Sequence, residues 1–258
     1  MKSFWPRLLP YILLGLTLCI ASDLVAQDNA DAPGSSPGID ISVRLGQEGG
    51  GDDVSVAIQL VVLMTLLSLA PAIVLLMTSF MRIIIVLGFL RNALGLQSVP
   101  PTQVLVGMSV FLSFFLMMPV GERIQAEALE PFQAGDITSI EAFNLASKPL
   151  ADFMLKQTRT EDIEFFLSIA NMPPTSVDDL PMRIIVPSFI LSELRTAFQM
   201  GFLIFLPFLV VDFIVATVLM AMGMMMMPPV IVSLPFKILL FVMVDGWYLI
   251  IRSLVTSF

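Results

Sequence analysis

Residues 187–229 read PSFILSELRTAFQMGFLIFLPFLVVDFIVATVLMAMGMMMMPP, and this stretch decides the fold class. It joins two strongly apolar blocks, at about 183–222 and 230–258, that are separated by the segment GMMMMPP at 223–229. A helix needs about 20 apolar residues to cross the ~30 Å hydrocarbon layer of a bilayer, and each block is longer than that. The sequence therefore predicts an all-α integral membrane protein.

The composition of the whole chain agrees with this prediction. Of the 258 residues, 57% are hydrophobic and 13% are charged, whereas soluble domains carry about 25% charged residues. The sequence has no His, and its one Cys is Cys19. These features exclude His-based acid–base catalysis, Cys or His metal sites and thiol nucleophiles. A GxxxxGK[ST] phosphate-binding loop is also missing, so we expect neither an enzyme nor a bound cofactor.

The first 53 residues have two different characters. Two basic residues precede an apolar run at 8–20, which is the pattern of a secretory signal, so residues 1–26 are predicted to be a cleavable signal peptide. An uncleaved first span is the alternative. Residues 27–53 are acidic and rich in Gly, Pro and Ser, which predicts a flexible linker because such a segment buries too little surface to become ordered.

The first hydrophobic helical region, residues 54–121, is predicted to contain two spans. The first span has no charged residue, and Pro71 inside it predicts a kink or a break. Arg82 and Arg91 lie between the two spans and have no acidic neighbour in the sequence. By the positive-inside rule, this connection is expected on the cytoplasmic side.

Residues 122–182 change character, with many more acidic than basic residues and several prolines near the end. Apolar residues recur there at helical spacing, as at Ile163, Phe166 and Leu167. The shortage of Lys and Arg favours the outer side of the membrane. We therefore expect a small periplasmic helical domain, followed by a second hydrophobic helical region at 183–258.

Five charged residues lie inside the apolar blocks of this second region. A charge at the centre of a lipid-exposed helix costs on the order of 3 kcal/mol, so such residues must pair, face water or be buried in an assembly. The sequence favours ion pairs that hold helices or subunits together over a proton relay, because a relay usually has acidic residues and His in series. Lys237 is the natural partner of either Glu193 or Asp212. The five residues are Glu193, Arg195, Asp212, Lys237 and Asp245.

The segment 223–229 contains four consecutive methionines. Gly223 before them and Pro228 and Pro229 after them indicate a loop between two helices. Methionine is unbranched and polarizable, so it repacks around objects of different shape. A ring of such loops could close a pore against ions and still yield to a polypeptide, although a Met-rich hairpin turn buried in the membrane fits the pattern equally well. The methionines are Met224, Met225, Met226 and Met227.

Three stretches resemble the signature segments of the FliP/SctR family of type III export-gate proteins. They are TSFMRIIIVLGFLRNALG at 78–95, the quoted segment at 187–229, and LPFKILLFVMVDGWYLI at 234–250. The resemblance extends from about residue 54 to residue 258 and includes the acidic insert. The signal peptide and acidic linker at the front fit the flagellar branch of the family.

The resemblance implies a structural, pore-forming subunit that conducts unfolded export substrates across the bacterial inner membrane during flagellum assembly. Family members form helical hairpins in a multi-pass, pentameric-type ring with FliQ and FliR at the flagellar basal body, where contacts with FlhB, FlhA and FliO are also expected. The methionine loop of the family acts as a gasket, and here it corresponds to Met224, Met225 and Met226. Met227 stands where a Val is common, and the charged residues would hold helices or subunits together.

Two other classes of function compete with this interpretation. A small-solute or ion transporter would use Glu193, Asp212 and Lys237 near the midplane, with the GMMMMPP segment as a break in a helix. The lack of an inverted repeat counts against it. An intramembrane protease would need two facing Asp residues, for which Asp212 and Asp245 are the one candidate pair. Nothing in the sequence suggests a nucleic-acid partner.

Overall fold

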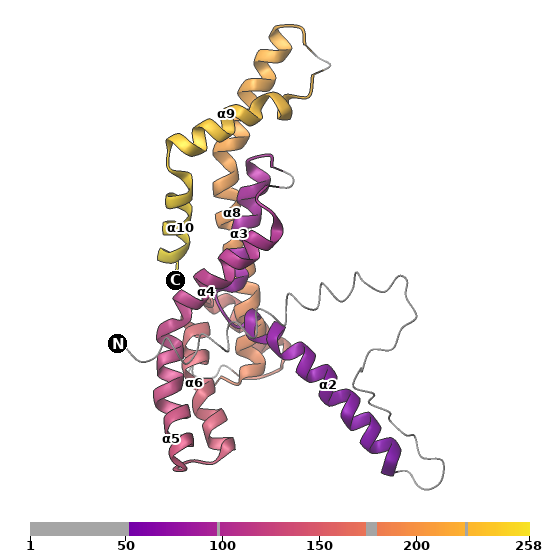
Figure 1. Cartoon of the computed structure of the whole chain (residues 1–258), viewed down its shortest axis with the longest axis vertical. Coiled ribbons are helices and arrows are strands. Elements are labelled where there is room, and N and C mark those ends of the chain that lie inside the picture. The colour runs from indigo at the N-terminus through magenta and orange to yellow at the C-terminus, as the bar shows by residue number, and fades with distance from the viewer. Residues whose placement is uncertain (1–51, 97–98, 174–179, 225–226) are drawn as a thin grey trace, which may run out of the picture. The chain divides into compact units, whose positions relative to one another are not determined.

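The computed structural model describes residues 52–96, 99–173, 180–224 and 227–258. The expected signal peptide and almost all of the expected linker lie outside these ranges. By its internal contacts the chain divides into two units, Met1–Ala57 and Ile58–Phe258, and the description below concerns the second. Its described residues form helices and no strand, which confirms the all-α prediction (Figure 1).

Helix α2 (Asp52–Leu76) is the first apolar helix, and none of its residues from Ile58 to Leu76 is buried against the rest of the chain. The break predicted at Pro71 does not occur there, because the helix continues through this residue to Leu76. The interruption lies at 77–79, where the hydroxyl of Thr78 donates to the carbonyl of Leu75 at 2.7 Å and accepts from the N–H of Phe80 at 3.3 Å. Such local bonds compete with the helical pattern and explain why the helix ends at this position.

Helices α3 (Phe80–Ala93), α4 (Thr102–Ile124) and α8 (Met182–Ala221) form the centre of one core. Helix α3 packs along both α4 and α8, as can be followed in Figure 1. One face of α4 carries Ser109 and Ser113, both buried, and small side chains of this kind let helices approach closely. The buried members of this core are Ile83, Val86, Leu87, Leu90, Ala93, Leu94, Leu105, Ala197, Phe208, Phe241, Ile250 and Leu254.

The acidic region that follows α4 folds as helices. Helix α4 continues without a break into a π-helical turn, η1 (Gln125–Leu129), and then into α5 (Glu130–Ala134). The change of composition near residue 122 therefore falls inside a helix. Helices α6 (Ser139–Gln157) and α7 (Thr160–Ile169) come next. Together with the first turns of α8 they bury a second core of Met154, Ile163, Leu167, Leu180, Ile184, Ile185 and Phe189.

Helix α8 takes part in both cores, and its length requires this. At 1.5 Å per residue, its 40 residues extend about 60 Å, which is roughly twice the thickness of the hydrocarbon layer. Its first turns pack against α6 and α7, whereas large apolar side chains from Phe198 onward are exposed. The first part of α8 therefore packs as in a soluble domain, whereas the rest of the helix has an apolar surface suited to face lipid or other subunits.

Helices α9 (Pro229–Met243) and α10 (Gly246–Thr256) complete the chain, and they are bent by 64° at the corner between them. Asp245 sits at this corner with a φ of 51°. A Cβ on Gly246 would lie 2.2 Å from the ring of Phe241, so the close turn requires glycine. Three helical segments within the described ranges are long and apolar enough to cross a membrane, namely Ile58–Leu76, Thr102–Ala134 and Met182–Ala221, and α9 with α10 would count as a fourth if they form one bent span.

Candidate functional site

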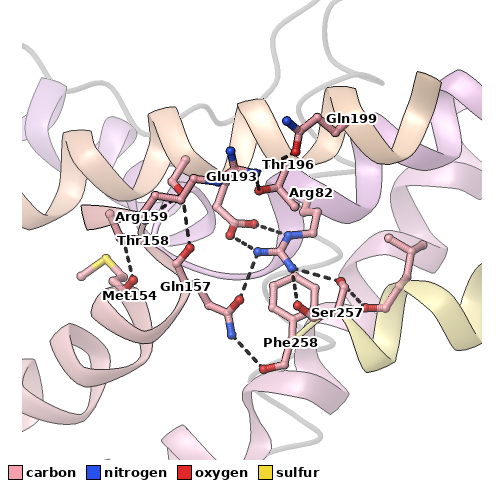
Figure 2. A network of polar contacts seen from close by, with 12 residues as sticks. Arg82, Met154, Gln157, Thr158, Arg159, Glu193, Thr196, Gln199, Ser257 and Phe258 are labelled. Atoms are coloured by element: carbon pink, nitrogen blue, oxygen red, sulfur yellow. Dashed lines mark hydrogen bonds and ion pairs between the residues drawn. The ribbon is translucent and has the colours of Figure 1, made fainter. Parts of the chain in front are cut away.

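A buried ion pair joins α3 to α8. The Nε of Arg82 donates to Glu193 Oε2 at 2.8 Å, and its Nη2 donates to Glu193 Oε1, so that the two planar groups meet edge to edge (Figure 2). The side chains are 2% and 0% exposed. A bidentate Arg–carboxylate pair fixes orientation as well as distance. The pair therefore sets the register of α3 on α8.

The remaining donors of Arg82 reach two other parts of the chain. Nη1 donates to the carbonyl of Ser257 at 2.7 Å and to its hydroxyl at 3.0 Å, and Nη2 donates to Gln157 Oε1 at 3.2 Å. The guanidinium lies 3.9 Å from the ring centroid of Phe258, whose carbonyl accepts from Gln157 Nε2 at 2.8 Å. Figure 2 shows these side chains converging on the guanidinium. One arginine thus ties together α3, α6, α8 and the residues after α10.

This arrangement bears on two expectations for Arg82. No acidic residue lies near Arg82 in the sequence, and its partner Glu193 is 111 residues further along the chain. The expected cytoplasmic position of Arg82 also conflicts with the expected periplasmic position of the helical region at 122–182, since Gln157 of that region bonds to Arg82 directly. The signal that could have revealed the pair was the presence of opposite charges in two apolar segments, Arg82 in one and Glu193 in the other.

A second ion pair joins α8 to α9, with the Lys237 side chain buried and the Asp212 side chain 28% exposed. Lys237 Nζ lies 2.6 Å from Asp212 Oδ2 and donates to the carbonyl of Ala93 at 3.3 Å. The hydroxyl of Ser233, one turn before Lys237, donates to Asp212 Oδ1. Of the two partners that the sequence left open for Lys237, the structure brings it to Asp212. These contacts hold α8, α9 and the end of α3 together near the base of the methionine loop.

Arg195 lies in a polar setting, although it stands within an apolar block of the sequence. Its guanidinium forms ion pairs at 3.3 Å with both Glu161 and Asp162 of α7, and the Arg195 side chain is 40% exposed. Nearby, Arg159 Nη2 donates to Gln199 at 2.7 Å. The polar surface of the α6–α7 segment thus reaches along α8 as far as Gln199. Beyond this point the apolar exposed surface begins.

Asp245 differs from the other four charged residues. It is exposed at the corner between α9 and α10 and makes no side-chain hydrogen bond or ion pair with any described residue. Its neighbours Met243 and Tyr248 are 78% and 58% exposed. The sequence predicted that such a charge pairs, faces water or is buried in an assembly, and no described residue pairs with Asp245.

The methionine segment connects α8 to α9, as predicted. Helix α8 ends at Ala221, Gly223 adopts a φ of 78°, and Pro228 and Pro229 begin α9. The left-handed backbone at Gly223 explains why glycine stands there. Met224 and Met227 are 41% and 48% exposed, whereas Met225 and Met226 lie outside the described residues.

The chemistry available to these groups is that of ion pairs. Where the structure is described, no three His, Cys, Asp or Glu side chains come close enough to hold a metal ion. Of the one Asp pair considered for a protease, Asp212 is engaged by Lys237 and Ser233, while Asp245 stands alone at its corner. The geometry therefore supports a structural role for the charged residues.

Comparisons with known proteins agree with one another. The sequence model of the FliP family matches residues 63–254. The chain is 53% identical over 208 residues to the flagellar biosynthetic protein FliP of Bacillus subtilis (strain 168), covering 80% of this chain and 94% of the relative. The proteins of the same name from Buchnera aphidicola subsp. Acyrthosiphon pisum (strain APS) and Pectobacterium carotovorum subsp. carotovorum are 47% and 50% identical. The first alignment spans this whole chain and 64% of the relative, and the second covers 81% of each.

Proposed function

The chain belongs to the FliP family, and we propose from this membership that it is a structural, pore-forming subunit of the flagellar type III protein export gate. Unfolded export substrates pass through the assembly on their way across the bacterial inner membrane. The family match over residues 63–254 is the single observation that carries this proposal. The role is structural rather than catalytic.

The exposed apolar surface of the chain supports the proposal that it works as part of an assembly. From Phe198 to Ile231, α8, the methionine loop and the start of α9 present large apolar side chains such as Phe202, Phe213 and Ile231, which are 63%, 67% and 69% exposed. Soluble monomers rarely expose contiguous apolar surface of this extent. Lipid or neighbouring subunits must cover it. A ring of copies with FliQ and FliR would do so, with FlhB, FlhA and FliO as further contacts.

The methionine loop is proposed to be the gasket of the pore. It lies at the tip of the hairpin formed by α8 and α9, beyond the pair of Asp212 and Lys237. Its proposed closing residues are Met224, Met225, Met226 and Met227, with Gly223, Pro228 and Pro229 shaping the turn. Flexible thioether side chains from several copies can fill an irregular central space and repack around a passing polypeptide.

The transporter alternative is not supported. The relatives carry the name of a flagellar biosynthetic protein rather than that of a transporter. The three charged residues on which it depended are also bound in fixed pairs, Glu193 with Arg82 and Asp212 with Lys237. A midplane site for a solute would need these groups free to exchange partners.

The proposal is tested by gentle detergent extraction of the tagged chain from its native membrane, followed by native mass measurement of the complex. We expect a large assembly that contains several copies of this chain and two other small hydrophobic subunits. The same extraction from a strain that carries the untagged chain serves as the background control. Recovery of a monomer or dimer without partners would overturn the proposal, since the apolar surface and Asp245 would then have nothing to cover them.

A further inference from the structure

Two opposite charges of the apolar helices have no ionic partner among the described residues. Asp245 is one of them. The other is Arg91 near the end of α3, whose Nη1 donates to the hydroxyl of Thr102 at 3.1 Å and whose Nε is buried without a hydrogen-bond partner. No carboxylate of the described residues pairs with this guanidinium. Both groups lie in strongly apolar segments, where an unpaired charge is unfavourable.

The two charges lie at similar heights along the core. Asp245 directly precedes α10 and Ser257, whose carbonyl binds Arg82, directly follows it, and the buried side chains of α10 share a core with those of α3. From Arg82 to Arg91 the rise is about 13 Å, and from Ser257 back to Asp245 it is about 18 Å at 1.5 Å per residue. The end of α3 is held against α9, because Lys237 of α9 donates to the carbonyl of Ala93. The difference in height, about 5 Å, is within the reach of an arginine side chain.

The two charges lie at different junctions between helices. Arg91 contacts Thr102 at the start of α4, whereas Asp245 lies at the corner of α9 and α10. Copies of a membrane protein inserted in the same orientation keep each group at its own height. Two copies placed side by side can therefore bring the α9–α10 corner of one to the α3–α4 junction of the next. Such a head-to-tail contact repeats around a ring.

We propose that the carboxylate of Asp245 forms an intersubunit ion pair with Arg91 of a second copy of this chain. The inference rests on the proposed function, since it requires several copies in one complex. This pair gives Asp245 the partner that it lacks. Arg91 is the unpaired cation whose height along the core is closest to that of Asp245. Arg252 on α10 also has no ion pair with a described residue, but it lies about 10 Å along the helix from Asp245.

Charge reversal is the first test, with native mass as the readout. We expect Arg91→Asp alone, or Asp245→Arg alone, to lower the recovery of multi-copy complexes about tenfold or more, because like charges then face each other in an apolar contact. The double reversal restores the opposite pairing between copies and should return recovery to near the wild-type level. Arg252→Asp is the matched control and should leave recovery unchanged. A double reversal that accumulates in membranes as well as wild type but remains unassembled would overturn the proposal.

Cross-linking between two differently tagged copies is the second test, and it remains informative if the reversals fail to fold. One copy carries Arg91→Cys, the other carries Asp245→Cys, and both carry Cys19→Ser. A short bis-maleimide should link the two tags, while the pair Arg91→Cys and Arg252→Cys should link far less. Equal linking of both pairs, or linking of Asp245→Cys to a different protein, would refute the pairing. Multi-copy complexes without the 91–245 link would refute this inference alone, whereas single-copy complexes would refute the proposed function.

Discussion

The carboxylate of Glu193 receives two hydrogen bonds from the guanidinium of Arg82, 111 residues earlier in the chain, and both side chains are almost fully buried. The guanidinium of Arg82 also donates to Ser257 and Gln157. A single side chain therefore connects α3, α6, α8 and the end of the described chain. A hydropathy profile does not reveal contacts of this kind.

Glu193→Gln should strongly destabilise the protein. The substitution leaves the Arg82 charge buried beside a neutral amide, and breaking a buried pair costs about 3–5 kcal/mol. We expect little protein in membranes and a markedly lower melting temperature of what remains in detergent. The control is Arg123→Gln, which removes exposed pairs with Glu127 and Asp152 and should cost less than about 1 kcal/mol. Equal losses in the two variants would contradict the special role of the buried pair.

Lys237→Ala should reduce the amount of assembled complex more than the double substitution Asp212→Leu with Lys237→Met. The single change leaves the Asp212 carboxylate without its cation, whereas the double change replaces both charges by apolar groups of similar size. The measurement is the amount of complex recovered after detergent extraction. If the double variant were the worse of the two, the pair would contribute more than mutual neutralisation.

Replacing Met224, Met225 and Met226 together by Ala should make membranes that contain the assembled gate leak ions. Alanine removes the long, adaptable side chains proposed to fill the closed pore. The leak is measured as the rate of ion efflux in cells with equal amounts of complex. Replacement of the exposed Met243 on α9, which lies away from the loop, is the control. Membranes as tight as wild type would exclude the gasket role.

Gly201→Ala should weaken the packing of α3 on α8. A Cβ at this position would lie 2.5 Å from Cδ2 of Phe89 and 3.1 Å from its Cβ, so the ring cannot simply rotate away. Overpacking of this kind costs about 1–3 kcal/mol. Thermal unfolding in detergent provides the measurement. Gly88→Ala, where a Cβ meets nothing within 4 Å, should leave the melting temperature unchanged or raise it.

The start of α6 should lose stability in acid. The N–H and the hydroxyl of Thr138 both donate to Glu141 at 2.9 Å and hold the pKa of Glu141 below its ordinary value of 4.5. Because folding lowers this pKa, the carboxylate stabilises the folded state fully above about 4.5, and this contribution disappears as the pH falls through the lower folded-state value. Unfolding measured between about pH 3 and pH 6 should show a flatter acid limb for Glu141→Gln than for wild type. Glu164→Gln, at an exposed position on α7, should leave the acid limb unchanged.

Composition and the positions of glycine and proline predicted a large part of the fold. The glycine and prolines around 223–229 marked the connection between α8 and α9, and the helical spacing of Ile163 and Leu167 marked α7. The partner of Arg82 could not be predicted, because ion pairs between distant segments depend on how helices pack. The break at 77–79 was also missed, since it arises from hydroxyl contacts of Thr78 while Pro71 is accommodated within α2. Hydropathy grouped Arg195 with the buried charges, although its side chain is 40% exposed and pairs with Glu161 and Asp162 of α7.

The length of α8 has a mechanical consequence. Its first turns are anchored in the core shared with α6 and α7, and its last turn leads directly into the methionine loop. A continuous helix of about 60 Å is a lever. If its anchored end tilts by only about 10°, its far end moves by about 10 Å, which is the diameter of a helix with its side chains. A small tilt of α8 caused by a force on the helices at 139–169 would therefore displace the loop by a large distance.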